Sequence, residues 1–224
     1  MKEILRTNLD RVIWDIEEAR ISVSEHHIVK LVSVSKYTSI ENISTLYELG
    51  HRSFGENQVQ QLKDRMNVLD SLPIEWNMIG SLQKNKINNL IDLSPSLMQS
   101  LDNLDLAEEL NKKLIAKDKK MNCLLQINAS NENSKSGFNI DEAYDKYQEI
   151  IESCPNIRLK GVMTIGINDD KKVQKNFEDT YNIFEKLQKD NASICSMGMS
   201  GDYQLAIKCG SNLVRIGSKL FGNS

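Results

Sequence analysis

The segment Ile28-Val-Lys-Leu-Val-Ser-Val-Ser-Lys36, followed by Ile40-Glu-Asn-Ile-Ser-Thr-Leu-Tyr-Glu-Leu49, carries the pattern that decides the fold. The first stretch is apolar and β-branched, as in a buried strand. The second is an amphipathic helix that Thr38-Ser39 can cap and Gly50 can end. Lys36 therefore lies where a strand opens into a loop that leads to a helix. In parallel α/β proteins, ligand-binding residues gather at this end of the strands.

The same order of strand and then helix recurs along the whole chain of 224 residues. An opening helix is predicted over residues 2–24, because apolar residues recur there at helical spacing. Strands are expected at 28–36, 51–54, 74–79, 97–101, 121–128, 158–165, 194–199 and 212–216. The clearest helices between them are expected at 59–69, 103–116, 141–154 and 172–189.

About eight such repeats without a linker indicate the α/β class. We expect a single (β/α)₈ TIM barrel with an additional N-terminal helix, forming one domain over residues 1–224. A doubly wound open sheet is the alternative, because the pattern alone does not show closure.

Composition excludes several classes of protein. A net charge of −3 argues against nucleic-acid binding, which needs a basic surface. The four cysteines have no paired spacing and no histidine nearby, so neither a disulfide framework nor a metal site is expected. The N-terminus is too charged for a signal peptide, and no apolar run is long enough to span a membrane. We therefore expect a soluble, cytoplasmic protein.

Polar and glycine residues follow each predicted strand at its carboxyl end. A lysine at such a position can act as a nucleophile toward a carbonyl, and Lys36 is the candidate. Ser200-Gly201 and Gly217-Ser218 follow the seventh and eighth strands, where barrels commonly bind phosphate. The alternative is that these glycines only form tight turns.

Arg215 precedes Gly217 by two residues, so both are expected on the same face of the last strand. If that face is the barrel interior, a charged donor lies beside the phosphate turns; a surface position is the alternative. An amine nucleophile, a phosphate site and an arginine at one rim together describe a Schiff-base site for pyridoxal 5′-phosphate (PLP).

Seven segments resemble the pyridoxal phosphate homeostasis protein family, in the family's order and over about residues 4–222. They are Leu31-Val-Ser-Val-Ser-Lys36, Arg52-Ser-Phe-Gly-Glu-Asn57, Ile79-Gly-Ser-Leu-Gln-Lys-Asn85, Ser134-Lys-Ser-Gly-Phe138, Gly161-Val-Met-Thr-Ile165, Ser196-Met-Gly-Met-Ser-Gly-Asp202 and Val214-Arg-Ile-Gly-Ser-Lys-Leu-Phe-Gly222.

The resemblance implies the barrel of fold-type III PLP proteins, which is shared with the N-terminal domain of alanine racemases. It implies that Lys36 carries the internal aldimine, a Schiff base, and that Arg215 faces the pyridine nitrogen. Ser200, Gly201, Gly217 and Ser218 would hold the phosphate, and Asn57 would line the cofactor pocket. The implied function is intracellular PLP homeostasis by a monomer without catalytic turnover, which holds the cofactor and delivers it to apoenzymes.

Two departures bear on the alternative function, a fold-type III enzyme such as an amino-acid racemase. The family usually has histidine where this chain has Asn77, which cannot titrate near neutrality. We also expect that the chain has no counterpart of the racemases' second domain. Racemisation needs a second base, and Tyr203 and Asp202 are better interpreted as residues at the start of a helix. A barrel enzyme that binds a phosphorylated metabolite without PLP is a third hypothesis.

Overall fold

The strands form a closed parallel ring in the computed structural model, which describes residues 1–129, 136–167, 169 and 172–222. The strands are β1 (Lys30–Val34), β2 (Ser53–Glu56), β3 (Glu75–Met78), β4 (Leu97–Leu101), β5 (Met121–Asn128), β6 (Phe138–Asn139), β7 (Ile157–Thr164), β8 (Ile194–Ser196) and β9 (Leu213–Ile216).

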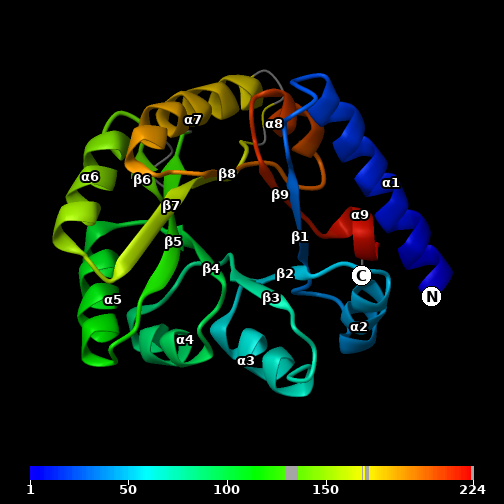
Figure 1. Ribbon diagram of the computed structural model, residues 1–224, viewed down its shortest axis with the longest axis horizontal. Coiled ribbons are helices and arrows are strands. Elements are labelled where there is room, and N and C mark those ends of the chain that lie inside the picture. Colours follow the sequence, from blue (N-terminus) through cyan, green and yellow to red (C-terminus); the bar gives the residue numbers. More distant parts are fainter. Residues whose placement is uncertain (130–135, 168, 170–171, 223–224) are drawn as a thin grey trace.

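Within the described residues, these nine strands are ordered β4-β3-β2-β1-β9-β8-β7-β5-β6. Because β4 also pairs with β5, the strands other than β6 close an eight-stranded barrel (Figure 1). The predicted TIM barrel is therefore confirmed, and the open sheet is wrong.

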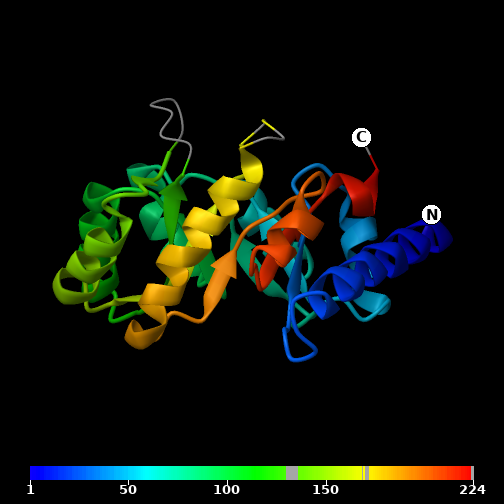
Figure 2. The same cartoon turned by 90° about the horizontal axis from the view of Figure 1, so that it is seen from above.

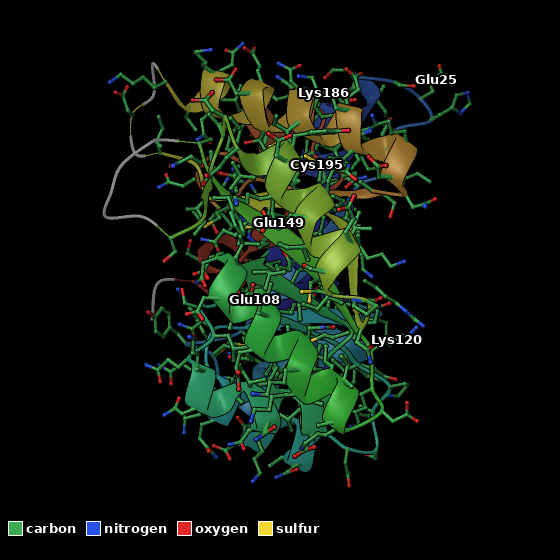
Figure 3. All side chains as sticks on the ribbon, turned by 90° about the vertical axis from the view of Figure 1, so that its left-hand side faces the viewer. Glu25, Glu108, Lys120, Glu149, Lys186 and Cys195 are labelled. Atoms are coloured by element: carbon green, nitrogen blue, oxygen red, sulfur yellow. The ribbon has the colours of Figure 1, made fainter. Side chains whose placement is uncertain are left out.

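Helices surround the barrel on its outer side (Figure 1). They are α1 (Lys2–Ile21), α2 (Ile40–Glu48), α3 (Val59–Val68), α4 (Ile87–Leu93), α5 (Leu104–Ala116), α6 (Ala143–Ser153), α7 (Val173–Leu187), α8 (Tyr203–Lys208) and α9 (Ser218–Phe221), with short 3₁₀ turns at Lys84–Lys86 and Gln188–Asp190. Figure 3 shows Glu108, Glu149 and Lys186 on the outward faces of α5, α6 and α7. No helix in the part that the structure describes is long and apolar enough to cross a membrane.

The helix after β1 begins and ends as its sequence predicts. The side chain of Ser39 accepts a hydrogen bond from the backbone N–H of Asn42, which caps the first turn of α2. Gly50 follows the helix with a φ of 99°, a conformation that glycine adopts without strain. The direction of β1 and α2, and so the position of Lys36 between them, follows from these local signals.

Most strands begin or end within three residues of the expected bounds, and two differences affect how the sequence was interpreted. β2 covers Ser53–Glu56 rather than 51–54, so Glu56 belongs to the strand and not to the loop after it. β6 was not predicted, because it has only two residues, which pair with Ile127 and Asn128 at the end of β5. Neither difference changes the order of the barrel.

Apolar side chains divide between two cores. The larger core lies between the strands and the surrounding helices. A smaller cluster fills the barrel and consists of Val32, Leu97, Leu124, Met163 and Leu213. Cys123, Cys154 and Cys195 are buried, as expected of small apolar residues.

α1 lies against two short helices, α8 after β8 and α9 after β9 (Figures 1 and 2). The side chain of Asn8 donates a hydrogen bond to the backbone carbonyl of Leu220 at 2.9 Å, and the hydroxyl of Tyr203 donates to Asp15. The additional N-terminal helix therefore holds the segments that follow β8 and β9.

Candidate functional site

A cavity of about 970 Å³ lies at the carboxyl ends of β1, β8 and β9. Its size is within the usual range for pockets that bind small molecules. The structure brings six of the seven predicted binding residues to its wall: Lys36, Ser200, Gly201, Arg215, Gly217 and Ser218.

Asn57, the seventh, is not among the described residues that line this cavity. It follows β2, and its backbone lies so close to Gly80 that a Cβ on Gly80 would be 2.1 Å from the Asn57 carbonyl oxygen. A contact between Asn57 and a bound ligand therefore stays a prediction.

Lys36 lies in a tight turn that neighbouring strands and helices hold at several points. The backbone N–H of Ser35 donates to the carbonyl of Gly55 at 3.0 Å, and the N–H of Thr38 donates to the carbonyl of Ser35 at 3.0 Å. The Lys36 side chain is half-buried, and its Nζ lies 4.8 Å from the centre of the Tyr37 ring. The amine thus has a defined place at the cavity wall.

Three side chains from β2 and α3 fasten this turn, and we call Glu56, Gln61 and Arg65 the Lys36 brace. Gln61 donates to the backbone carbonyl of Lys36 at 2.6 Å. Arg65 donates to the carbonyl of Thr38 at 2.9 Å. Glu56 accepts a hydrogen bond from the Ser35 hydroxyl at 2.5 Å. The residues on both sides of Lys36, and Lys36 itself, are therefore held from one side.

The brace contains a buried ion pair, because Arg65 Nη1 lies 3.0 Å from Glu56 Oε1 and both side chains are less than 10% exposed. Burial raises the pKa of Glu56, while the Ser35 hydroxyl and Arg65 oppose that shift. Oε2 of Glu56 has no hydrogen-bond partner. Sequence reasoning missed the brace because it placed Glu56 in the loop after the second strand and not within the buried strand.

The two predicted phosphate turns lie side by side. The backbone N–H of Gly217 donates to the Ser200 hydroxyl at 3.2 Å, which joins the turn after β9 to the turn after β8. Gly201 has open space where a Cβ would be. A second hollow of about 400 Å³ beside these turns is lined by Ser200, Gly201, Ser218 and Lys219, so a cation that was not predicted lies next to them.

Arg215 points into the barrel and is 4% exposed, so the interior position considered from the sequence is the observed one. Its guanidinium donates to the backbone carbonyl of Thr164 at 2.8 Å and to both the carbonyl and the hydroxyl of Ser196. Burial lowers the pKa of Arg215 to about 10, with Asp202 opposing the shift. The side chain therefore remains positively charged at neutral pH.

Tyr203 and Asp202 lie at the start of α8 and do not line the cavity. The Tyr203 hydroxyl donates to Asp15, and burial together with Asp15 raises the pKa of Tyr203. Asp202 accepts a hydrogen bond from the backbone N–H of Met199 at 2.6 Å. Both residues thus have the helix-start positions that the sequence predicts.

Comparisons with known proteins show the family of this chain. The model of the family "Alanine racemase, N-terminal domain" matches residues 8–224. The pyridoxal phosphate homeostasis protein of Helicobacter pylori strain J99 is 50% identical over 218 residues, which cover 96% of this chain and 97% of that protein. The chain belongs to the pyridoxal phosphate homeostasis protein family.

Solved structures support the family and the fold. PipY of Synechococcus elongatus, whose structure is described as having PLP bound, is 26% identical, covers 92% of this chain and all of that chain, and superposes with a TM-score of 0.78. Alanine racemase of Clostridium difficile is 17% identical and has a TM-score of 0.76 over 99% of this chain, but only 57% of the racemase is covered. That second likeness shows the shared barrel alone.

Proposed function

We propose that this homeostasis-family protein binds PLP in the cavity between Lys36 and the two phosphate turns. We propose that it holds the cofactor inside the cell and delivers it to apoenzymes. The observation that carries the proposal is the meeting of an amine, two hydroxyl- and glycine-bearing turns and a buried guanidinium at one cavity. Each of these groups matches one part of PLP.

Different residues of the cavity suit different parts of PLP. Lys36 supplies an amine for the aldehyde, and the Lys36 brace keeps its backbone in place. The hydroxyls of Ser200 and Ser218 and the backbone N–H groups of their turns suit a phosphate. Arg215 provides a fixed positive charge for the ring nitrogen. Bound PLP supplies a reactive aldehyde and an electron-accepting ring.

The role of a carrier, rather than a catalyst, is supported by the side chains at the cavity. Among the described residues that line it, Lys36, Tyr37 and Arg215 have ionisable side chains. Arg215 is too basic to accept a proton, and the Tyr37 side chain is 74% exposed. A racemase needs one base on each face of the substrate carbon. Residues 1–224 are proposed to act as one PLP-binding domain, as a monomer in the cytoplasm.

The experiment that tests PLP binding is an absorbance spectrum of the protein with PLP, before and after borohydride reduction. Reduction is expected to fix a pyridoxyl group on Lys36, identified by peptide mass spectrometry. Lys36→Ala is expected to lose the visible absorbance band. Lys30→Ala is the matched control, because Lys30 lies at the other end of β1 and pairs with Glu75. A spectrum of Lys36→Ala identical to that of the unchanged protein would refute the assignment.

Delivery needs its own measurement. The protein loaded with PLP is mixed with an apoenzyme that uses PLP, and the recovered enzyme activity is followed with time. Transfer faster than from the same concentration of free PLP would support direct delivery. So would transfer that continues in the presence of a phosphatase that hydrolyses free PLP. Recovery at the rate of free PLP, abolished by the phosphatase, would reduce the proposal to storage.

A further inference from the structure

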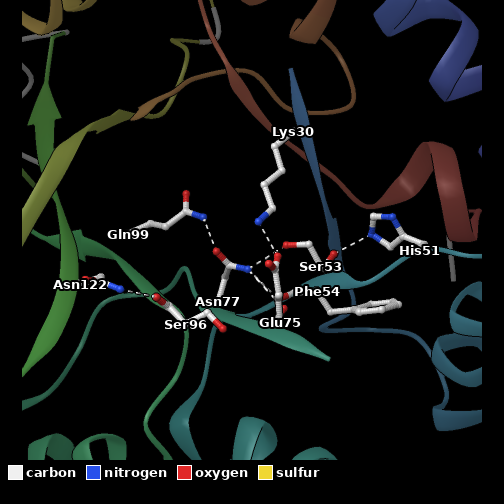
Figure 4. A network of polar contacts seen from close by, with 9 residues as sticks. All are labelled: Lys30, His51, Ser53, Phe54, Glu75, Asn77, Ser96, Gln99 and Asn122. Carbon is white, nitrogen blue, oxygen red and sulfur yellow. Dashed lines mark hydrogen bonds and ion pairs between the residues drawn. The ribbon is translucent and has the colours of Figure 1, made fainter. Parts of the chain in front are cut away.

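Buried polar side chains form a continuous line across the interior of the barrel. The guanidinium of Arg215 donates to the Ser196 hydroxyl, which in turn donates to Oε1 of Gln99 at 2.7 Å. Nε2 of Gln99 donates to Oδ1 of Asn77 at 3.0 Å. Nδ2 of Asn77 then donates to the Ser53 hydroxyl at 3.1 Å (Figure 4). We call Arg215, Ser196, Gln99 and Asn77 the interior chain.

Every hydrogen bond of the interior chain has its donor on the side of Arg215. The Gln99 amide is oriented by both neighbours, because its oxygen faces Ser196 and its nitrogen faces Asn77. The single hydroxyl proton of Ser196 is directed to Gln99, so its lone pairs are left for Arg215. Hydrogen bonds that follow one direction polarise and strengthen one another.

The interior chain is unusual for its place in the fold. The inside of a TIM barrel is normally filled by branched apolar side chains. Here Ser196 and Gln99 are fully buried, and Asn77 and Arg215 are each 4% exposed. Burial of so many polar groups is tolerated only when each finds a partner. All four have hydrogen-bond partners in this chain, which makes it a built arrangement rather than a packing gap.

We propose that Ser196, Gln99 and Asn77 are positioning residues that hold the Arg215 guanidinium in the orientation that faces the ring nitrogen of PLP. The inference rests on the proposed function, since it assigns a purpose to the place of Arg215 at the cavity wall. Arg215 is anchored to Thr164 on one side and to the interior chain on the other. Loss of a link in the chain weakens this side-chain contact, so the guanidinium is held mainly by the backbone carbonyls of Thr164 and Ser196 and less firmly than before.

The test compares two ligands in variants of the chain: PLP and its 1-deaza analogue, which has carbon in place of the ring nitrogen. Gln99→Met keeps the size of the side chain but removes both hydrogen bonds. We expect it to weaken PLP binding about tenfold, the effect of about one hydrogen bond to a charged group, while affinity for the analogue stays unchanged. Ser196→Ala interrupts the chain one link closer to Arg215 and is expected to show the same selective loss.

Gln126→Met is the matched control for loss of a buried glutamine. Gln126 is 6% exposed on β5 and donates to the backbone carbonyl of Ser136 at 2.9 Å, outside the interior chain. We expect it to leave the ratio of the two affinities unchanged. An equal loss for both ligands in Gln99→Met and Ser196→Ala would overturn the positioning role. Failure of the unchanged protein to bind PLP would overturn the proposed function and this inference with it.

A second measurement needs no ligand and applies even where affinity is too low to compare. Nitrogen-15 NMR of arginine side chains in the unliganded protein reports rotation of the Arg215 guanidinium. We expect slow rotation in the unchanged protein and in Gln126→Met, and faster rotation in Gln99→Met and Ser196→Ala. Unchanged slow rotation in the last two variants would show that the backbone carbonyls of Thr164 and Ser196 are enough to fix Arg215, and would contradict the proposal.

Discussion

Arg65 donates a hydrogen bond to the backbone carbonyl of Thr38 at 2.9 Å and so joins α3 to the turn that carries Lys36. The same guanidinium pairs with Glu56, whose carboxylate holds the Ser35 hydroxyl on the other side of Lys36. Lys36 therefore lies between two anchored neighbours. Preorganisation of this kind lowers the cost of fixing a reactive group when a ligand binds.

Replacement of Arg65 by methionine is expected to destabilise the protein strongly. The change leaves the fully buried Glu56 without its cation, and breaking a buried pair on one side costs about 3–5 kcal/mol. Urea denaturation measures the loss. Lys2→Met, which breaks an exposed pair with Glu48, is the control and should cost no more than about 1 kcal/mol. Similar losses of unfolding free energy in the two variants would show that the buried ion pair stabilises the protein no more than an exposed one.

The raised pKa of Glu56 predicts a direction of pH dependence. Its ordinary value is 4.5, and burial raises it in the folded protein. Between the ordinary and the raised pKa, the folded protein binds more protons at this group than the unfolded chain does. The contribution of Glu56 to the free energy of unfolding therefore falls as pH rises through that window.

Glu56→Gln removes this titration and keeps the size of the side chain. We expect the free energy of unfolding of the unchanged protein, minus that of Glu56→Gln, to decrease as pH rises above about 4.5, the ordinary value. Urea unfolding at a series of pH values measures the difference. An increase with pH would mean that Ser35 and Arg65 outweigh burial and lower the pKa instead.

Ser200→Ala is expected to weaken binding of PLP about tenfold or more, because charge-assisted hydrogen bonds contribute roughly 1.5–3 kcal/mol. Binding of pyridoxal, which has no phosphate, should barely change. Titrations followed by absorbance give both affinities. Ser153→Ala, on the exposed side of α6, is the control and should affect neither ligand. Equal losses for both ligands in Ser200→Ala would place the phosphate elsewhere.

Amino acids are expected not to exchange their Cα proton on this protein faster than on free PLP. The reason is that Lys36 can act as a base on one face of the substrate Cα, whereas the described residues at the cavity provide no buried base for the other face. NMR in deuterated water follows exchange for L- and D-alanine. Tyr37→Phe is the informative variant, because Tyr37 lies beside Lys36. Exchange with inversion that Tyr37→Phe abolishes would establish a racemase.

The fold and the cavity could be predicted because both follow from local patterns. Ser39 and Gly50 define α2, the helix after β1, and repetition of that strand–helix unit brings all strand ends to one rim. Lys36 and Arg215 are far apart in the chain, yet β1 pairs with β9, so both lie at neighbouring strand ends. That they line one cavity depends on closure of the barrel, which the strand pattern alone left open. Ser134 and Lys135, from one of the resemblance segments, lie outside the described residues.

The remaining features depend on contacts that no local pattern contains. Gln99 and Ser196 are 97 positions apart, and neither belongs to a local pattern that indicates a contact between them. Their meeting depends on which strands face each other across the barrel and on the register between them. Glu56 was missed for a related reason, since a shift of two positions in β2 moved it from an expected loop into the strand.

The contact between Asn8 and Leu220 joins residues that are 212 positions apart. The pairing of β1 with β9 likewise joins the first strand to the last. Contacts of such long sequence separation form late, because the chain must first pay the entropy of closing the loop between them. During synthesis, the earliest helix and strand therefore emerge long before their partners. Because β9 supplies Arg215 and leads into the turn at Gly217, the ligand-binding rim is complete only once β9 has paired with β1.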